Sequence, residues 1–143
     1  MQQTLSYCIT FLKKNFDRFC GERLAQLGLT RGLLFFLIYI GKYPACSPGA
    51  LSDALRADSG HTARSVDKLV QSGFVRRARS DADARAFTLQ LTQSGEEAFQ
   101  SVRSLFAEWD ESILAHTPPQ EREAALNFLI ALVRPKEGAC DVR

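Results

Sequence analysis

The sequence predicts a mainly α-helical protein with one small β-hairpin, and three observations support this fold class. Apolar residues recur every three to four positions along most of the 143-residue chain, which is the spacing of amphipathic helices. Residues 87–92 instead alternate between apolar and polar, as a half-buried strand does. The hairpin that this strand would complete follows two short helical stretches joined by a turn. Together these features predict a winged helix-turn-helix with further helices on both sides.

Composition and charge narrow the classes of function. The chain is 45% hydrophobic and 24% charged, which suits one folded domain with a substantial core. Residues 1–85 carry 13 Lys+Arg against 7 Asp+Glu, whereas residues 86–143 carry 5 against 9. The basic excess lies in the half that contains the predicted helix-turn-helix. This asymmetry favours a polyanionic partner there.

The N-terminal charges and the cysteines indicate the compartment. Charged residues at 13, 14, 17 and 18 interrupt the first apolar segment, so we expect no signal peptide. The longest apolar run, residues 32–41, is about half the length of a bilayer span. The four cysteines and two histidines lack ligand-like spacing, so we expect no metal site and no cofactor. A cytoplasmic protein with free thiols and no membrane contact is expected.

Two helices open the chain. Residues 5–20 carry apolar side chains at helical spacing, and Gly21 and Gly28 are expected to bracket a looser connection. Thr30 is then expected to cap a second helix, residues 31–42, which is apolar nearly all round. A helix of that kind must be covered on most sides.

The helix-turn-helix follows. Ser47 caps a short helix that ends at Leu55 and begins with proline at its first position, with Leu51, Ala54 and Leu55 expected to point inward. Asp58 or Ser59 caps the second helix. Its packed side is expected to contain Thr62, Ala63, Val66, Leu69 and Val70, and its outer side Gly60, His61, Arg64, Lys68 and Gln71.

A basic hairpin comes directly after Gly73, a natural helix stop. Its strands are expected at residues 74–79 and 87–92, joined by a polar loop at residues 80–85. Four arginines lie within ten residues, namely Arg76, Arg77, Arg79 and Arg85. In a winged helix the second helix reads the DNA major groove while the wing reaches the backbone or the minor groove.

Two helices close the chain. Thr92 is expected to cap a long helix over residues 93–115, with an apolar stripe of Phe99, Val102, Phe106, Trp109 and Ile113. Thr117 is expected to cap a last helix that carries Leu126, Leu129, Ile130 and Val133 and stops at Pro135.

These elements suggest three regions within one compact domain. Residues 1–42 form an N-terminal dimerisation helix and a buried helix, residues 43–92 the winged helix-turn-helix, and residues 93–143 the C-terminal dimerisation helices and tail. The outer helices offer more apolar surface than a small winged helix can cover, so a second copy is expected to cover it. The residues expected to contact double-stranded DNA are Ser59, His61, Thr62, Arg64, Ser65, Lys68, Arg77, Arg79, Asp83 and Arg85.

Short signatures in a fixed order resemble those of the MarR family of bacterial transcriptional regulators. They are Leu29-Thr30, the run from Arg64 to Leu69, Gly73-Phe74-Val75-x-Arg77, Asp83-x-Arg85-Ala86 and Leu91-Thr92-x-x-Gly95. The resemblance covers residues 5–133. It implies a homodimer that represses or activates transcription at a palindromic operator, often with release by a small aromatic effector. The chain departs from the family at residues 60–63, where a Ser-Thr-Val-Thr-like run is usual.

Several alternatives stay open. The sequence contains no nucleophile elbow, phosphate loop, metal cluster or paired-acid constellation, so an enzyme is not expected. A repressor is the leading hypothesis, and an effector pocket would be sought first at Phe16, Phe19, Phe36 and Tyr39. Some relatives sense peroxide through a cysteine in the first helix, which makes Cys8 the redox candidate. A winged helix that binds an acidic protein instead of DNA is the second class.

Overall fold

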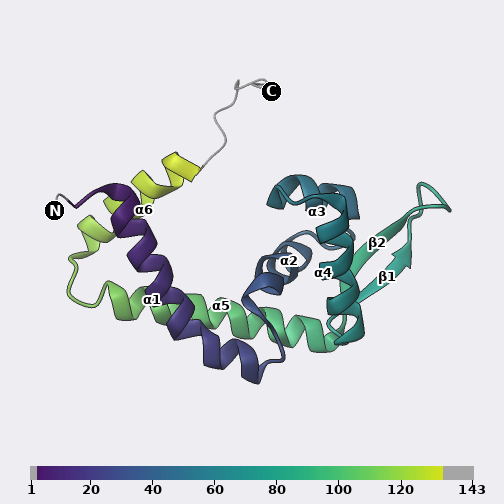
Figure 1. Ribbon diagram of the computed structural model, residues 1–143, viewed down its shortest axis with the longest axis horizontal. Coiled ribbons are helices and arrows are strands. Elements are labelled where there is room, and N and C mark those ends of the chain that lie inside the picture. Colours follow the sequence, from purple (N-terminus) through teal and green to yellow (C-terminus); the bar gives the residue numbers. More distant parts are fainter. Residues whose placement is uncertain (1–2, 134–143) are drawn as a thin grey trace. The chain divides into compact units, whose positions relative to one another are not determined.

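The computed structural model describes residues 3–133 (Figure 1). These residues form a mainly helical fold with one two-stranded antiparallel sheet, which confirms the predicted fold class. Chain contacts divide it into two compact units, Met1–Trp109 and Asp110–Arg143, which are described separately. The elements in order are α1 (Leu5–Gln26), α2 (Arg31–Lys42), α3 (Pro48–Leu55), α4 (Ser59–Gln71), β1 (Val75–Arg79), β2 (Phe87–Leu91), α5 (Gln93–Ile113) and α6 (Pro119–Val133).

Helix α1 is longer than predicted. Gly21 lies inside it, and the helix continues to Gln26, so the expected loose connection at residues 21–28 was wrong. Burial explains the difference: Cys20 and Leu24, one turn apart, are 0% and 1% exposed and hold this part of the helix against the core. The helix stops before Gly28, whose φ of +75° suits glycine.

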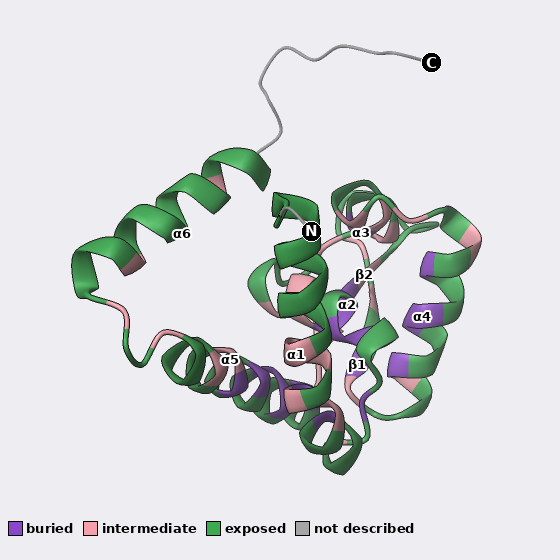
Figure 2. Ribbon diagram, turned by 60° about the vertical axis from the view of Figure 1, so that its left-hand side comes forward, coloured by how far each residue is buried: buried purple, intermediate pink, exposed green. Residues whose placement is uncertain are grey.

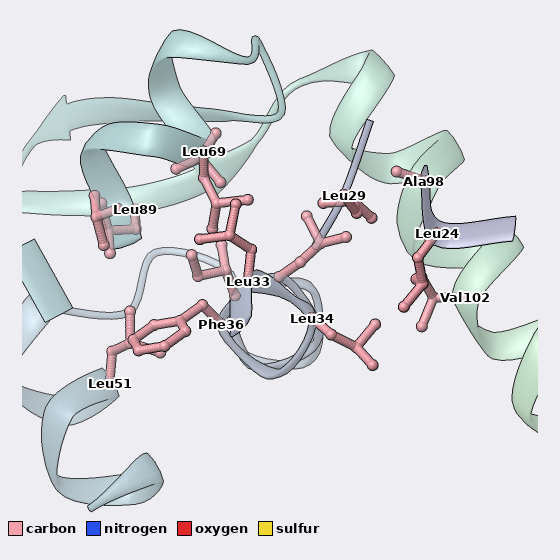
Figure 3. Packing of buried hydrophobic residues seen from close by; sticks show 14 of the residues in the cluster. Leu24, Leu29, Leu33, Leu34, Phe36, Leu51, Leu69, Leu89, Ala98 and Val102 are labelled. Atoms are coloured by element: carbon pink, nitrogen blue, oxygen red, sulfur yellow. The ribbon is translucent and has the colours of Figure 1, made fainter. Parts of the chain in front are cut away.

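The core of the first unit is centred on α2. Leu33, Leu34, Phe36, Leu37 and Ile40 are buried, and α2 contacts α1, α3, α4 and β2. Figure 3 shows side chains from these elements meeting around α2, with Ala98 and Val102 of α5 beside Leu24. The predicted covering of α2 is therefore confirmed, except that Phe35 stays 55% exposed. No single helix within residues 3–133 is both long and apolar enough to cross a membrane. Helices α1 and α2 meet the criteria of length and composition only as a pair, which is bent by 76°.

The helix-turn-helix is capped as predicted at both starts. Ser47 Oγ accepts the Ala50 N–H at 3.0 Å, and Asp58 Oδ1 accepts the His61 N–H at 2.7 Å. Helix α3 ends at Leu55, and the C-cap residue Arg56 adopts a left-handed φ of +50°. In α3 only Leu51 is fully buried, and Ala54 is exposed rather than inward as predicted.

The two strands of the wing pair antiparallel, with Val75 opposite Leu91 and Arg79 opposite Phe87 (Figure 1). The first strand begins one residue later than predicted, at Val75. A third backbone segment, just before α3, extends the sheet: Leu89 N–H donates to the Cys46 carbonyl at 2.8 Å, and Ala45 N–H donates to the Leu89 carbonyl at 3.1 Å. This pairing ties the root of the wing to the start of the helix-turn-helix.

A tight junction joins α4, the wing and α5. The Thr92 hydroxyl donates to the Gly73 carbonyl and accepts the Gly95 N–H at 3.0 Å, which confirms the predicted cap. Thr92 N–H donates to the Phe74 carbonyl at 3.0 Å. Gly95 faces the same carbonyl so closely that an added Cβ would lie 1.9 Å from its oxygen. The chain can therefore cross here only with glycine at residue 95.

Helix α5 ends at Ile113, two residues earlier than predicted. Its buried residues are Gly95, Ala98, Phe99, Val102 and Leu105. Phe106 and Trp109 are half-buried against α1. The ring of Phe16 meets both rings edge-on, with 5.2 Å between ring centroids in each pair. Trp109 Nε1 donates to Asn15 Oδ1 at 2.9 Å. Ile113, predicted on the packed stripe, is 38% exposed.

Helix α6 of the second unit begins at Pro119, so Thr117 lies outside its first turn and the predicted Thr117 cap was wrong. Arg122 secures the start of the helix instead, because its Nε donates to the Thr117 carbonyl at 2.9 Å and its Nη1 pairs with Glu111 at 3.3 Å. None of its residues is buried, and Figure 2 shows α6 exposed along nearly its whole length. The predicted stop at Pro135 lies outside the described residues.

We predict that Gly95→Ala lowers the free energy of unfolding by about 2–4 kcal/mol, because the Phe74 backbone cannot move away from the new methyl group. Urea denaturation followed by circular dichroism measures the change. Gly21→Ala is the matched control, since nothing lies within 4 Å of its added Cβ and the residue is helical. The control should raise stability by up to about 1 kcal/mol. Equal stability of the two variants would contradict the proposed role of the junction.

Candidate nucleic-acid interface

Helix α4 divides its residues sharply between packing and exposure. Its buried residues are Thr62, Ser65, Val66 and Leu69, which lie within a sector of roughly 100°. Thr62 and Ser65 were predicted to contact DNA, but they are 1% and 4% exposed, and the Ser52 hydroxyl donates to Thr62 Oγ1 at 2.8 Å. Thr62 is therefore part of the packing with α3, and Ser65 is buried among the packed residues of α4. Ala63, predicted on the packed side, lies roughly 60° beyond this sector and is exposed.

The outer face of α4 carries four of the residues predicted to contact DNA, in exposed positions: Ser59, His61, Arg64 and Lys68. At the start of the helix, the hydrogen bond from the His61 N–H holds the pKa of the Asp58 carboxyl below its ordinary value, and nearby Arg64 acts in the same direction. The carboxylate therefore stays ionised at the positive end of the helix dipole.

Gly60 has a local role in this first turn. A Cβ at this position would lie 3.2 Å from Asp58 Oδ1 and 3.3 Å from Arg64 Nη1. Glycine thus leaves room for the capping carboxylate and for the Arg64 guanidinium to lie over the same turn.

His61 is anchored on one side by the core. Its ring meets the buried ring of Phe36 edge-on, with 5.5 Å between ring centroids and 74° between planes. The imidazole is nevertheless exposed. This contact limits how the exposed side chain can turn.

Arg77 connects the wing to α4, the second helix of the helix-turn-helix, which is called the reading helix below. It forms an ion pair with Asp67 of α4, and its guanidinium carbon lies 5.3 Å from the centroid of the Phe87 ring on β2. Asp67 therefore has a structural partner on the wing. Because Arg77 already has two intramolecular partners, its first role is to hold β1, β2 and α4 together.

The tip of the wing carries the remaining predicted residues. Arg79, Asp83 and Arg85 are all exposed. Asp83 Oδ1 accepts the Arg85 N–H at 2.9 Å, so the carboxylate shapes the loop backbone. Arg76, on the same strand as Arg79, donates to Gln90 Oε1 at 2.7 Å.

An apolar hollow of about 160 Å³ lies between the helix-turn-helix and the wing. It is lined almost wholly by carbon atoms of Pro48, Gly49, Ser52, Ser59, Thr62, Ala63, Val66, Arg77 and Phe87. Sequence periodicity missed this feature because it placed Ala63 in the core. Ala63 and Phe87 line the same hollow although they are far apart in the sequence, and local spacing of residues cannot predict such a contact.

The four aromatic residues considered for an effector pocket make four different contacts. Phe16 packs against α5, and Phe19 lies 5.1 Å from the Arg23 guanidinium carbon, measured to the ring centroid. Phe36 meets His61, and the ring of Tyr39 lies tilted by 40° against that of Tyr43, with 4.6 Å between centroids. A separate hollow of about 600 Å³ lies between α2 and α5. Its lining combines Phe99 and Phe106 with the cations Lys42 and Arg103.

The described cysteines differ in access. Cys8 is exposed on α1, Cys20 is buried, and Cys46 is half-buried. Burial raises the pKa of the Cys20 and Cys46 thiols, which disfavours the reactive thiolate at both. Cys140 lies outside the described residues.

Comparison with known proteins agrees with this geometry. The model of the MarR family matches residues 29–87, from the start of α2 to the start of β2. The HTH-type transcriptional regulator BilQ of Clostridium symbiosum is 43% identical over 138 residues, which is 96% of each chain. A MarR transcriptional regulator from Methanosarcina mazei superposes with a TM-score of 0.81 at 26% identity, over 90% of this chain and 92% of that one.

The structure of the S. aureus MepR–DNA complex shares the fold, with a TM-score of 0.79 at 18% identity, over 92% of this chain and 98% of that one. Fold, matched residues and the near full-length relative agree. The chain belongs to the MarR family of DNA-binding winged helix-turn-helix transcriptional regulators.

Proposed function

We propose that the protein is a repressor that binds a palindromic operator as a homodimer, with α4 in the major groove and the wing on the adjacent backbone or minor groove. The observation that carries this proposal is the set of exposed basic side chains on α4 and on the wing that follows it. Arg64 and Lys68 of α4 and Arg79 and Arg85 of the wing are all exposed, while Arg77 is held between the two elements.

Repression, rather than activation, is the simplest outcome of such binding. A dimer seated across a promoter excludes polymerase without any further contact, whereas activation needs a surface that recruits it. The MepR–DNA structure shows that a protein of this fold binds DNA.

Exposed apolar side chains support the homodimer. Helix α1 exposes Leu5, Ile9 and Phe11 by 53%, 48% and 63%, and α6 exposes Leu126 and Phe128 by 59% and 58%. Large apolar patches of this kind are rarely left to water. A second copy supplies the same patches by symmetry, and two-fold symmetry would place two α4 helices about 34–36 Å apart on a palindrome.

The effector is proposed to occupy the hollow between α2 and α5. Aromatic rings of Phe99 and Phe106 suit a planar apolar ligand, and Lys42 and Arg103 suit a negative substituent. A small aromatic anion fits both features. Since α2 also packs on α3 and α4, a ligand there would act on the reading helix through the core.

We expect Arg64→Ala to weaken binding to a selected operator by about 1–3 kcal/mol and to relax preference at one base pair, if Arg64 reads a guanine edge. The measurement is fluorescence anisotropy with DNA selected from a random pool and with single-position variants of it. Arg18→Ala, which removes an exposed arginine from α1, is the matched control and should bind like the wild type. Equal weakening on every sequence would make Arg64 a phosphate contact instead.

Arg85→Ala tests the wing. Each phosphate contact that is lost should lower the slope of log K against log salt by about 0.9, so two wings should lower it by about 1.8. Titrations between 50 and 200 mM salt provide this slope. A salt slope equal to that of the wild type would show that Arg85 does not reach the DNA backbone.

The dimer has its own test. Sedimentation at micromolar concentration should show a dimer for the wild type and a shift toward monomer for Phe128→Glu, which puts a charge on the exposed apolar surface of α6. Gln120→Glu introduces the same charge at an exposed polar position of α6 and should remain dimeric. A wild-type monomer would remove both the homodimer and the palindrome from the proposed function.

A further inference from the structure

The apolar hollow between α3, α4 and the wing is open at its rim and closed at its floor. Ala63, Ser59 and Gly49 at the rim are exposed, and Phe87 is 38% exposed. Thr62 and Val66 at the floor are 1% and 2% exposed. A group from outside could therefore enter only from the surface that α4 and the wing share.

Three of the four polar side chains that line the hollow, those of Ser52, Thr62 and Arg77, have partners within the protein, and the fourth, Ser59, lies at the exposed rim. Ser52 donates to Thr62 at 2.8 Å, and the Arg77 guanidinium pairs with Asp67. A phosphate or a guanine edge placed in the hollow would lose hydrogen bonds to water and regain few, which is costly. The hollow therefore suits an apolar group.

We propose that this hollow receives the C5-methyl group of a thymine in the operator. This inference rests on the proposed DNA binding by α4 and the wing. Ala63 directly precedes Arg64 in the chain, and the hollow is lined by both α4 and β2, so a duplex that touches Arg64 and the wing passes over it. Among the groups on major-groove base edges, the thymine methyl is the apolar one.

Replacing thymine by deoxyuridine removes this methyl group and leaves every hydrogen-bonding atom in place. In the selected operator, each thymine is replaced singly and the affinity of the full-length protein is measured by anisotropy. One thymine in each half-site should show a loss of about fourfold, the effect of exposing one buried CH₂-sized group. The remaining thymines should show no comparable loss.

Ala63→Ser connects this loss to the hollow. The variant adds a hydroxyl at the rim on an exposed helical position, and it should abolish the difference between thymine and deoxyuridine at the sensitive site. Ala54→Ser makes the same change on an exposed position of α3 that does not line the hollow, and it should keep the difference. A difference that persists in Ala63→Ser would overturn the inference.

Operator binding and the thymine-methyl contact are tested separately by these measurements. Salt-dependent, sequence-preferring binding in which no thymine responds to methyl removal would overturn the methyl contact alone. Absence of any sequence preference would overturn the proposed operator binding, and the methyl contact with it.

Discussion

The backbone junction at Phe74 is the constraint on which the arrangement of the reading helix, the wing and the start of α5 depends. Its carbonyl accepts the Thr92 N–H and lies against Gly95, while the Thr92 hydroxyl joins the Gly73 carbonyl to the Gly95 N–H. The end of α4, the end of β2 and the start of α5 are thus held together at this junction. The close approach of Gly95 to the Phe74 carbonyl is a contact between backbones, so side-chain movement cannot relieve it. Because the geometry is set there, Arg77 needs only to pair with Asp67 and lie over Phe87 to fix the wing beside α4.

The charged residues of α4 and the wing fall into two groups. Arg77 and Asp67 have partners within the protein, whereas Arg64, Lys68 and Arg85 project from elements whose positions are already determined. Side chains held on a rigid frame lose less entropy when they bind, since only their own rotamers become ordered. The exposed ion pairs contribute little to stability by themselves. The role of the Arg77–Asp67 pair is positional, because it joins α4 to the first strand of the wing.

Much of this could be predicted from local pattern. Helix starts at Ser47 and Asp58, the basic hairpin and the Thr92 cap follow from residue type and spacing alone, and the structure has them there. The failures share a cause, which is tertiary contact. Gly21 is helical because Cys20 and Leu24 are held by the core. Thr62 and Ser65 are buried, so their hydroxyl groups do not face outward, and Thr62 is bonded to Ser52 of α3. Polar residue type predicted a contact, but the direction of each side chain around α4 decided it.

The direction of each side chain around α4 also limits how this helix can discriminate between DNA sequences. Of its first seven residues, Gly60 has no side chain, Thr62 and Ser65 are buried, and Ala63 presents only a methyl group. Among these seven residues the exposed side-chain hydrogen-bond donors are Ser59, His61 and Arg64, and Lys68 is exposed one turn after Arg64. The ring of His61 contacts Phe36. Few donors can specify few base edges by hydrogen bonding. In the proposed binding mode, shape and apolar contact must therefore supply much of the sequence preference, and the hollow beside Ala63 is an apolar feature next to these residues.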